Sequence, residues 1–183
     1  LFLVPEISLT PQTLSRLISR FGNRVAVIHS GITEKQRYEE WHRIKKGEVD
    51  IVIGVRSALF APFERLGLVI IDEEHEHTYK QEETPRYHAR DVGIMRAKLN
   101  SAVCILGSAT PSLESFVNAQ KGKYKLLKLT KRVASGSLPN VQIVDLREES
   151  KGEEEIVISE LLKTKIRERL ERKEQSMLLI NRR

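Results

Sequence analysis

The sequence has almost no cysteine and no long apolar run, and both absences exclude classes of protein. Cys104 is the single cysteine, so no disulfide can form within the chain. It lies inside an apolar run, where we expect a buried, unreactive thiol. No stretch has the roughly 20 consecutive apolar residues that a membrane-spanning helix needs, and residues 1–5 are too short a run for a signal peptide. We therefore expect a soluble protein of the reducing cytoplasm.

The overall composition is that of a globular protein. Of the 183 residues, 40% are apolar, which is enough for one sizeable core. The net charge of +6 favours a polyanionic partner such as nucleic acid, although a charge of this size also occurs in proteins that bind none. The net charge alone therefore favours nucleic-acid binding only slightly over the other classes of function.

Short apolar runs recur along the chain, and each is followed by a polar turn and a segment with helical periodicity. This alternation predicts an α/β fold with a mostly parallel sheet. The chain begins without methionine and ends in an unfinished apolar run, so we expect a fragment cut at both ends. The five predicted strands are residues 1–4, 25–28, 49–53, 68–71 and 102–106.

Two helices have specific start signals. Thr33 and Gln36 form a capping box ahead of a segment whose apolar residues we expect to face the core, Trp41 included. Thr110 is the predicted cap of a later helix, with Pro111 in its first position and Gly122 at its end. The residues predicted to face inward are Tyr38, Trp41 and Ile44 in the first helix, and Leu113, Phe116 and Val117 in the second.

A Gly/Ser/Pro-rich stretch divides the chain. We place a first domain at residues 1–132, a linker at 133–140 and the start of a second domain at 141–183. Within the second domain the patterns predict a strand at 141–146, a helix at 159–174 and a strand at 177–180.

The most informative segment is the acidic string that follows the apolar run at 68–71. Asp72 and Glu73 fall at the carboxyl end of a predicted buried strand, the edge at which open α/β sheets bind ligands. An aspartate there can hold Mg²⁺, and the next glutamate can orient or deprotonate the water that attacks a phosphate. His75 lies close behind. The alternative is a strand that ends in an ordinary solvated acidic loop.

A second string of small and hydroxyl residues follows the run at 102–106. Because both loops leave the sheet at one edge, Ser108 and Thr110 are placed to hydrogen-bond His75 or the acidic residues. Gly107 and Ala109 are small enough for that loop to move. The alternative is a simple helix cap, and for Thr110 the two roles are compatible.

Two further segments suggest contacts with nucleic acid. Arg56 and Ser57 follow the run at 49–53 and suit a backbone phosphate, although alone they are an ordinary strand-loop. The segment 79–88 combines aromatic and basic residues, and aromatic stacking on a base contributes about 1 to 3 kcal/mol. The alternative for that segment is packing at the start of a helix that runs to Leu99. Its candidate residues are Tyr79, Lys80, Arg86, Tyr87 and His88.

A zinc site is the competing interpretation of the histidine-rich part of the chain. His75, Glu76, His77 and His88 are potential ligands. A structural zinc site usually has four ligands in characteristic pairs, and one cysteine is too few for the common ligand sets. We therefore do not favour zinc here.

Taken in order, these strings resemble superfamily 2 helicases of the DEAH-box type, and most closely the primosomal replication-restart helicases of bacteria. The resemblance covers nearly the whole chain. It implies a RecA-like lobe of the P-loop NTPase type followed by the start of a second lobe, with ATP and Mg²⁺ bound between lobes. It also implies 3′-to-5′ movement on single-stranded and forked DNA at stalled replication forks, with primosome proteins and single-stranded DNA-binding protein as partners. The strings that carry it are 3–12, 54–62, 72–75, 79–81, 85–91, 107–112 and 179–183.

The resemblance also assigns roles to residues. It implies that Asp72 serves Mg²⁺, that Glu73 is the catalytic base and that His75 connects them to Ser108 and Thr110. The other residues of the two ATP-coupling strings are Glu74, Gly107 and Ala109, and the additional DNA contacts are Pro5, Glu6, Ser8, Arg56 and Ser57. Asn181, Arg182 and Arg183 begin a second-lobe motif. In that family zinc is held by cysteines further along, none of which lies in this chain.

The chain departs from the family by having no GxxxxGK[ST] phosphate loop. Without its amide groups and lysine, tight ATP binding is not expected. We therefore expect a DNA-dependent ATPase and helicase in the full-length protein and almost no hydrolysis by the fragment alone. A branch-migrating translocase on duplex DNA and a non-catalytic nucleic-acid binding module stay open as alternatives.

Overall fold

The computed structural model describes residues 1–5, 11–131, 139–149 and 157–179. The chain forms two compact units, Leu1–Lys128 and Leu129–Arg183. Most of the linker predicted at 133–140 lies outside the described residues, so the division into a first lobe, a linker and a second lobe stays a prediction. Among the described residues, no helix is both long and apolar enough to cross a membrane.

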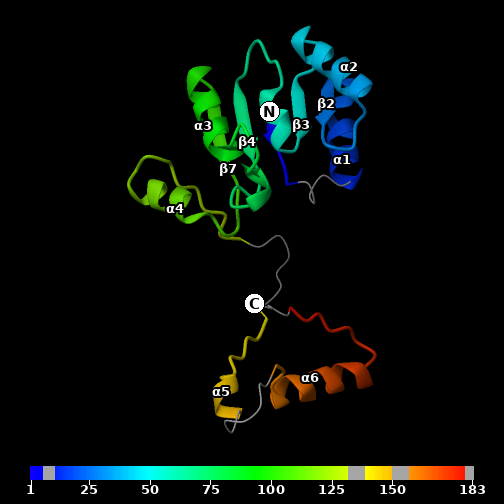
Figure 1. The fold of residues 1–183 in the computed structure, drawn as a ribbon, viewed down its shortest axis with the longest axis vertical. Coiled ribbons are helices and arrows are strands. Elements are labelled where there is room, and N and C mark those ends of the chain that lie inside the picture. The colour runs from blue at the N-terminus through cyan, green and yellow to red at the C-terminus, as the bar shows by residue number, and fades with distance from the viewer. Residues whose placement is uncertain (6–10, 132–138, 150–156, 180–183) are drawn as a thin grey trace. The chain divides into compact units, whose positions relative to one another are not determined.

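The first unit is built on a parallel sheet, which confirms the predicted α/β class (Figure 1). Its strand order within the described residues is β2-β3-β1-β4-β7. The short strand β1 is central, because Leu3 pairs with Gly54 on one side and with Ile71 on the other. Each strand falls on one of the five predicted runs: β1 Phe2–Leu3, β2 Val25–Ile28, β3 Ile51–Gly54, β4 Leu68–Ile71 and β7 Val103–Leu106.

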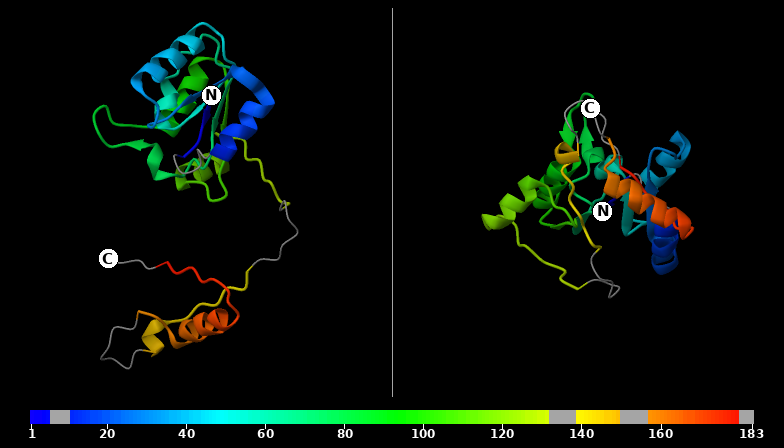
Figure 2. Two further views of the ribbon diagram at one scale, coloured as in Figure 1. Left: turned by 90° about the vertical axis from the view of Figure 1, so that its right-hand side faces the viewer. Right: turned by 90° about the horizontal axis from the view of Figure 1, so that it is seen from below.

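Helices cover both faces of this sheet. The helix α1 (Pro11–Phe21) packs through Leu14 and Leu17 on one face, and α2 (Glu34–Lys45) and α3 (Ala89–Leu99) lie on the other (Figure 2). The packing of α3 is close, since a Cβ atom at Gly93 would lie 2.9 Å from the Cδ1 atom of Ile71. Helix α3 therefore packs tightly against strand β4, which leads into the acidic string. Shorter helices complete the unit: η2 Gly22–Arg24, η3 Arg56–Phe60, η4 His77–Tyr79 and α4 Leu113–Gln120.

The start of α2 was predicted correctly, but its buried face was not. Thr33 and Gln36 form the expected capping box, and Ile44 is buried. Trp41, predicted to be in the core, is instead 39% exposed and has the Lys45 ammonium 5.0 Å from its ring centre. Each three-residue step falls about 60° short of a full turn, so Tyr38 lies roughly 120° around the helix from Ile44. Tyr38 therefore points to solvent.

The cap of α4 also differs from the prediction. Ser112, two residues after Thr110, is the N-cap, and its hydroxyl accepts a hydrogen bond from the amide of Ser115. Leu113 and Phe116 are exposed, contrary to the expected inward face, because α4 does not lie against either core cluster. The stop signal was correct, since Gly122 follows the helix with a φ of +73°.

The second unit contains α5 (Leu146–Glu149) and α6 (Glu160–Glu171). The helix predicted at 159–174 is confirmed, with Ser159 as its cap. The strands predicted at 141–146 and 177–180 are wrong for the residues that are described, since 139–145 and 174–179 have no regular structure. A strand needs a hydrogen-bonded neighbour, and the described part of this unit offers none.

Candidate functional site

The acidic string forms a tight turn at the carboxyl end of β4. The amide of Asp72 donates to the carbonyl oxygen of Leu3 at 2.9 Å, so the aspartate is still held by the sheet. Glu73, directly after it, has a left-handed φ of 45°, which is uncommon for a residue with a side chain and occurs often at functional sites. The hydroxyl of Tyr79 donates to the carbonyl oxygen of Asp72 at 2.7 Å and fixes the turn from the other side.

The loop after β7 lies directly beside this turn. The amide of Gly107 donates to Ile71, and the amide of Glu74 donates back to the carbonyl oxygen of Gly107 at 3.0 Å. A Cβ atom at position 107 would lie 3.4 Å from the Oδ1 atom of Asp72. Glycine therefore lets the two loops approach until the Asp72 carboxylate touches the neighbouring backbone.

His75 joins the two loops through its side chain. Its Nδ1 atom lies 2.8 Å from the hydroxyl of Ser108 and 3.6 Å from the carboxylate of Glu73. Its Nε2 atom lies 3.5 Å from the hydroxyl of Thr110. The contact expected between His75 and the hydroxyl residues is thus present, and it places Glu73 in the same cluster.

Glu74 differs from its neighbours, because its side chain is only 1% exposed. Burial raises the pKa of the Glu74 carboxyl, but hydrogen bonds from Ser112, Arg90 and Ser115 outweigh that effect, so its pKa lies below the usual value. The carboxylate is ionised but turned away from solvent. Glu74 therefore lies behind the residues that face the sheet edge, and its predicted part in ATP coupling stays a prediction.

Asp72 fits the binding of Mg²⁺ with phosphates. Its Oδ1 atom accepts from the amide of Glu73 at 3.1 Å, and among the described residues it forms no ion pair with a cationic side chain. No group of three or more His, Cys, Asp or Glu side chains in the described ranges is placed to hold a metal ion. Mg²⁺ commonly uses one or two carboxylates together with substrate phosphates, so a single aspartate suits it.

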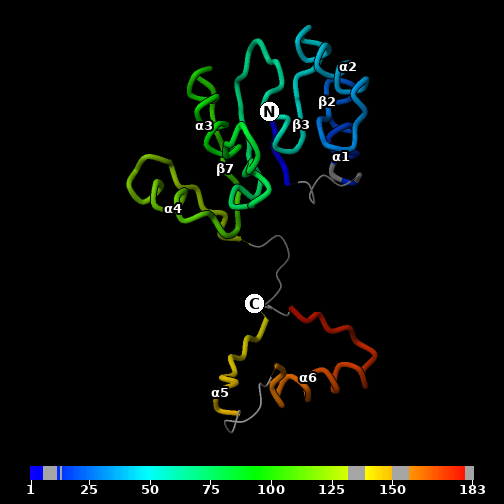
Figure 3. The backbone as a smooth tube through the Cα atoms, viewed as in Figure 1, coloured from blue at the N-terminus to red at the C-terminus, as the bar shows by residue number. Residues whose placement is uncertain are grey.

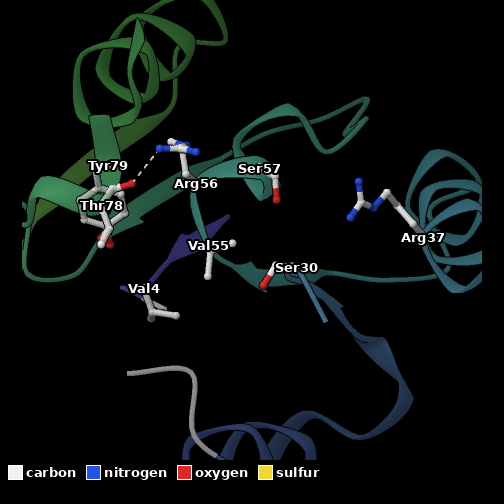
Figure 4. A pocket seen from close by; sticks show the side chains of 8 residues that line it. All are labelled: Val4, Ser30, Arg37, Val55, Arg56, Ser57, Thr78 and Tyr79. Carbon is white, nitrogen blue, oxygen red and sulfur yellow. Dashed lines mark hydrogen bonds between the residues drawn. The ribbon is translucent and has the colours of Figure 1, made fainter. Parts of the chain in front are cut away.

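A basic pocket lies at the same sheet edge, beyond the ends of β1, β2 and β3 (Figure 4). Its volume is about 390 Å³, and its described lining residues include two guanidinium groups and no carboxylate. Such a lining suits a phosphate. Ser30 and Arg37 were not among the predicted residues, although Ser30 follows the predicted strand 25–28 and so had to reach this edge. The lining residues are Val4, Ser30, Arg37, Val55, Arg56, Ser57, Thr78 and Tyr79.

Arg56 has a second task within this pocket. Its Nη1 atom donates to the carbonyl oxygens of Thr78 at 3.2 Å and Lys80 at 2.5 Å. The guanidinium therefore ties the loop after β3 to the segment that follows the acidic turn. Ser57 lines the pocket from the same loop.

The aromatic and basic segment forms a small hairpin of β5 (Lys80–Gln81) and β6 (Tyr87–His88), and Figure 3 follows the chain from β4 through it to α3. Lys80 and Arg86 are exposed. The ring of Tyr87 packs edge-on against Phe60, with centres 5.4 Å apart. Tyr79 is 1% exposed, so its predicted role in stacking on a base is wrong.

His88 ends the hairpin and begins the helix behind it. Its Nδ1 atom accepts from the amide of Arg90 at 3.3 Å, which caps α3. Burial lowers the pKa of His88, which favours the neutral imidazole that can accept this bond. The packing role held open for His88 from the sequence is therefore present, and a contact with DNA stays a prediction.

The other predicted residues are Pro5 and several that the structure does not describe. Pro5 is buried, so its ring is not available to a DNA strand. Glu6, Ser8, Asn181, Arg182 and Arg183 lie outside the described residues. Cys104 is partly buried, and burial raises the pKa of its thiol to about 11, which makes it unreactive as expected.

Comparison with known proteins adds two findings. A family model described as "DEAD/DEAH box helicase" matches residues 1–118. Relatives named "Replication restart protein PriA" align with essentially the whole chain. That of Bacillus subtilis (strain 168) is 52% identical over 99% of this chain and 22% of its own length. That of Haemophilus influenzae is 46% identical over 100% of this chain and 25% of its own length. The chain thus spans about a quarter of the length of these curated relatives.

Proposed function

The chain belongs to the DEAD/DEAH box helicase family, and on that basis we propose that it forms part of an ATP-driven DNA helicase that restarts stalled replication forks. The observation that best supports this proposal is the contact of His75 with Ser108 at 2.8 Å, which joins the acidic turn to the loop after β7. A solvated acidic loop with no chemistry would not require such a contact. The full-length protein would supply the phosphate loop.

The chemistry divides among three side chains. Asp72 would hold Mg²⁺, which when bound neutralises charge on the ATP phosphates. Glu73 would accept a proton from the attacking water, since its carboxylate is 41% exposed and held at the sheet edge by the left-handed turn. His75 would respond to the state of the ATP site and transmit it to the loop after β7 through its contact with Ser108.

DNA would lie along the other half of the same edge. The basic pocket offers Arg37, Arg56 and Ser57 to backbone phosphates, and the exposed Lys80 and Arg86 extend the basic surface onto the hairpin. The proposal includes 3′-to-5′ movement, with primosome proteins and single-stranded DNA-binding protein as partners. The names of the relatives support this choice over a branch-migrating translocase.

The test is ATP hydrolysis and strand separation by the full-length protein. We expect single-stranded DNA to stimulate turnover and a forked duplex to be unwound when ATP and Mg²⁺ are present. Salt-sensitive DNA binding with no effect of nucleotide would instead identify a non-catalytic binding module. Movement on blunt duplex DNA without unwinding of forks would identify a duplex translocase.

Replacing Arg37 with alanine in the full-length protein should weaken binding of single-stranded DNA about tenfold, because one charge-assisted hydrogen bond to a phosphate is lost. The salt dependence of log Kd should also fall by about one unit of slope. Fluorescence anisotropy at several salt concentrations measures both quantities.

Lys35→Ala is the matched control for this prediction. It removes the same charge from the same helix, but Lys35 is outside the pocket and its side chain is 86% exposed. We expect its affinity to stay within about twofold of the unchanged protein. Equal losses in the two variants would mean that general charge, and not the pocket, attracts DNA.

A further inference from the structure

A buried polar cluster lies behind the acidic turn and joins three separate segments. The Oε2 atom of Glu74 accepts hydrogen bonds from Ser112 Oγ at 2.9 Å, Ser115 Oγ at 3.0 Å and Arg90 Nη1 at 3.1 Å. Its Oε1 atom accepts from the amide of Ser112 at 2.7 Å. Arg90 Nη1 also donates to the Ser112 hydroxyl at 2.6 Å, and its Nε atom donates to Asp91 at 3.1 Å.

Each partner in this cluster belongs to a segment that already has a proposed task. Glu74 stands between Glu73 and His75 in the acidic turn. Arg90 lies at the base of the hairpin, two residues after His88, whose imidazole accepts from the Arg90 amide. Ser112 closes the loop after β7 and caps α4.

The hairpin is held through its other strand as well. Arg56 donates to the carbonyl oxygen of Lys80, the residue that pairs with His88 across the two strands. A movement of the hairpin on DNA would therefore be felt at both the basic pocket and Arg90.

We propose that Glu74 is a positioning residue that connects the hairpin at 80–88 to the turn that carries Glu73 and His75. This inference rests on the proposed function. A buried carboxylate that loses its cationic donor, here Arg90, is left with an uncompensated charge, which is strongly unfavourable. Arg90, Glu74 and Ser112 therefore move together, and a shift of the hairpin changes the position of Glu73.

The test compares two changes to the same cluster in the full-length protein. Glu74→Gln keeps the size of the side chain but turns an amide donor toward the donors of Arg90 and Ser112. Ser115→Ala removes one hydrogen bond from the same carboxylate without touching the path from Arg90 to Ser112. We expect both variants to unfold at a lower temperature than the unchanged protein.

Only Glu74→Gln should uncouple DNA from ATP. The ratio of DNA-stimulated to basal turnover should fall about tenfold, as for a typical coupling between sites, while Kd for single-stranded DNA changes less than about twofold. Ser115→Ala should keep the ratio of the unchanged protein. Turnover at varied DNA concentration separates the loss of maximal stimulation from a loss of affinity.

Arg90→Lys is a second, milder variant that keeps the charge balancing Glu74. A single ammonium cannot reproduce the guanidinium geometry, in which Nη1 donates to Glu74 and Ser112 while Nε donates to Asp91. We expect it to fold and to lose part of the stimulation, with DNA affinity retained.

Two results would overturn the inference alone. One is a folded Glu74→Gln protein that DNA stimulates as strongly as the unchanged protein. The other is an equal loss of the ratio in Glu74→Gln and Ser115→Ala, which would make the cluster a matter of stability only. An unchanged full-length protein whose turnover DNA does not stimulate would overturn the proposed function itself, and this inference with it.

Discussion

Replacing Glu73 with glutamine in the full-length protein should lower DNA-stimulated ATP turnover by about two to four orders of magnitude, which is the usual contribution of a general base. The reason is chemical and local. Glutamine has the size of glutamate and fits the left-handed turn at position 73, but its amide cannot accept a proton from water. Asp72 and the contact between His75 and Ser108 remain in place.

Nucleotide binding should survive this change, because the base acts in the chemical step and not on the bound phosphates. Titration with a fluorescent nucleotide in the presence of Mg²⁺ measures binding separately from turnover. We expect the affinity of the variant to stay within about threefold of that of the unchanged protein. A Glu73→Gln protein with undiminished turnover would refute the role of Glu73.

Glu76→Gln provides the matched control for Glu73→Gln. Glu76 lies in the same loop, and its amide donates to the carbonyl oxygen of Glu73 at 2.9 Å, but its side chain is not part of the cluster around His75. The same change in charge and size there should leave turnover within about twofold. Equal losses in the two variants would point to the overall charge of the loop instead of a base at position 73.

The sheet and its acidic edge could be predicted because both depend on local pattern. Apolar runs of four or five residues bounded by polar turns identify buried strands without knowledge of their neighbours. Parallel strands end at one edge, so Asp72 and Ser108 were both expected there, and the pairing of β4 with β7 places them side by side. Only the burial of the Glu74 side chain could not be predicted from its position between Glu73 and His75.

The wrong predictions share a different cause, because a sequence pattern does not say which neighbour, if any, covers a side chain. Leu113 and Phe116 have helical spacing, but spacing does not say whether a core surface exists to receive them, and here both are exposed. The pattern of residues 79–88 likewise does not distinguish Tyr79, which is buried under the acidic turn, from Tyr87, which packs on Phe60. Tertiary contacts decided each case.

Arg37 was missed for a related reason. It lies in the first half of α2, outside every string with a recognisable motif, and reaches the pocket only because α2 follows β2 at the functional edge. A sequence motif identifies only the residues that belong to it. It does not find a residue whose role depends on which strand lies next to which.

Replacing Gly54 with alanine should destabilise the first unit by about 3 kcal/mol or more, at the upper end of the cost of overpacking. Gly54 ends β3 between β1 and β2, where a Cβ atom would lie 2.0 Å from the carbonyl oxygen of Ile28 and 2.7 Å from the Cβ atom of Ala58. Neither atom belongs to a flexible side chain. Strand β2 or the helix η3 must therefore move away.

The measurement is thermal unfolding of the 183-residue chain by far-ultraviolet circular dichroism, with Gly67→Ala as the matched control. A Cβ atom at Gly67 meets nothing within 4 Å, and this residue is also in the first unit. We expect Gly54→Ala to lower Tm by roughly 10 °C or more and Gly67→Ala to leave it within about 2 °C.

Because η3 carries Arg56 and Ser57, the loss of stability should come with a distorted basic pocket. An unchanged Tm for Gly54→Ala would mean that β2 and η3 can separate freely, and then the close placement of Ser30, Arg37 and Arg56 would not be fixed by the fold.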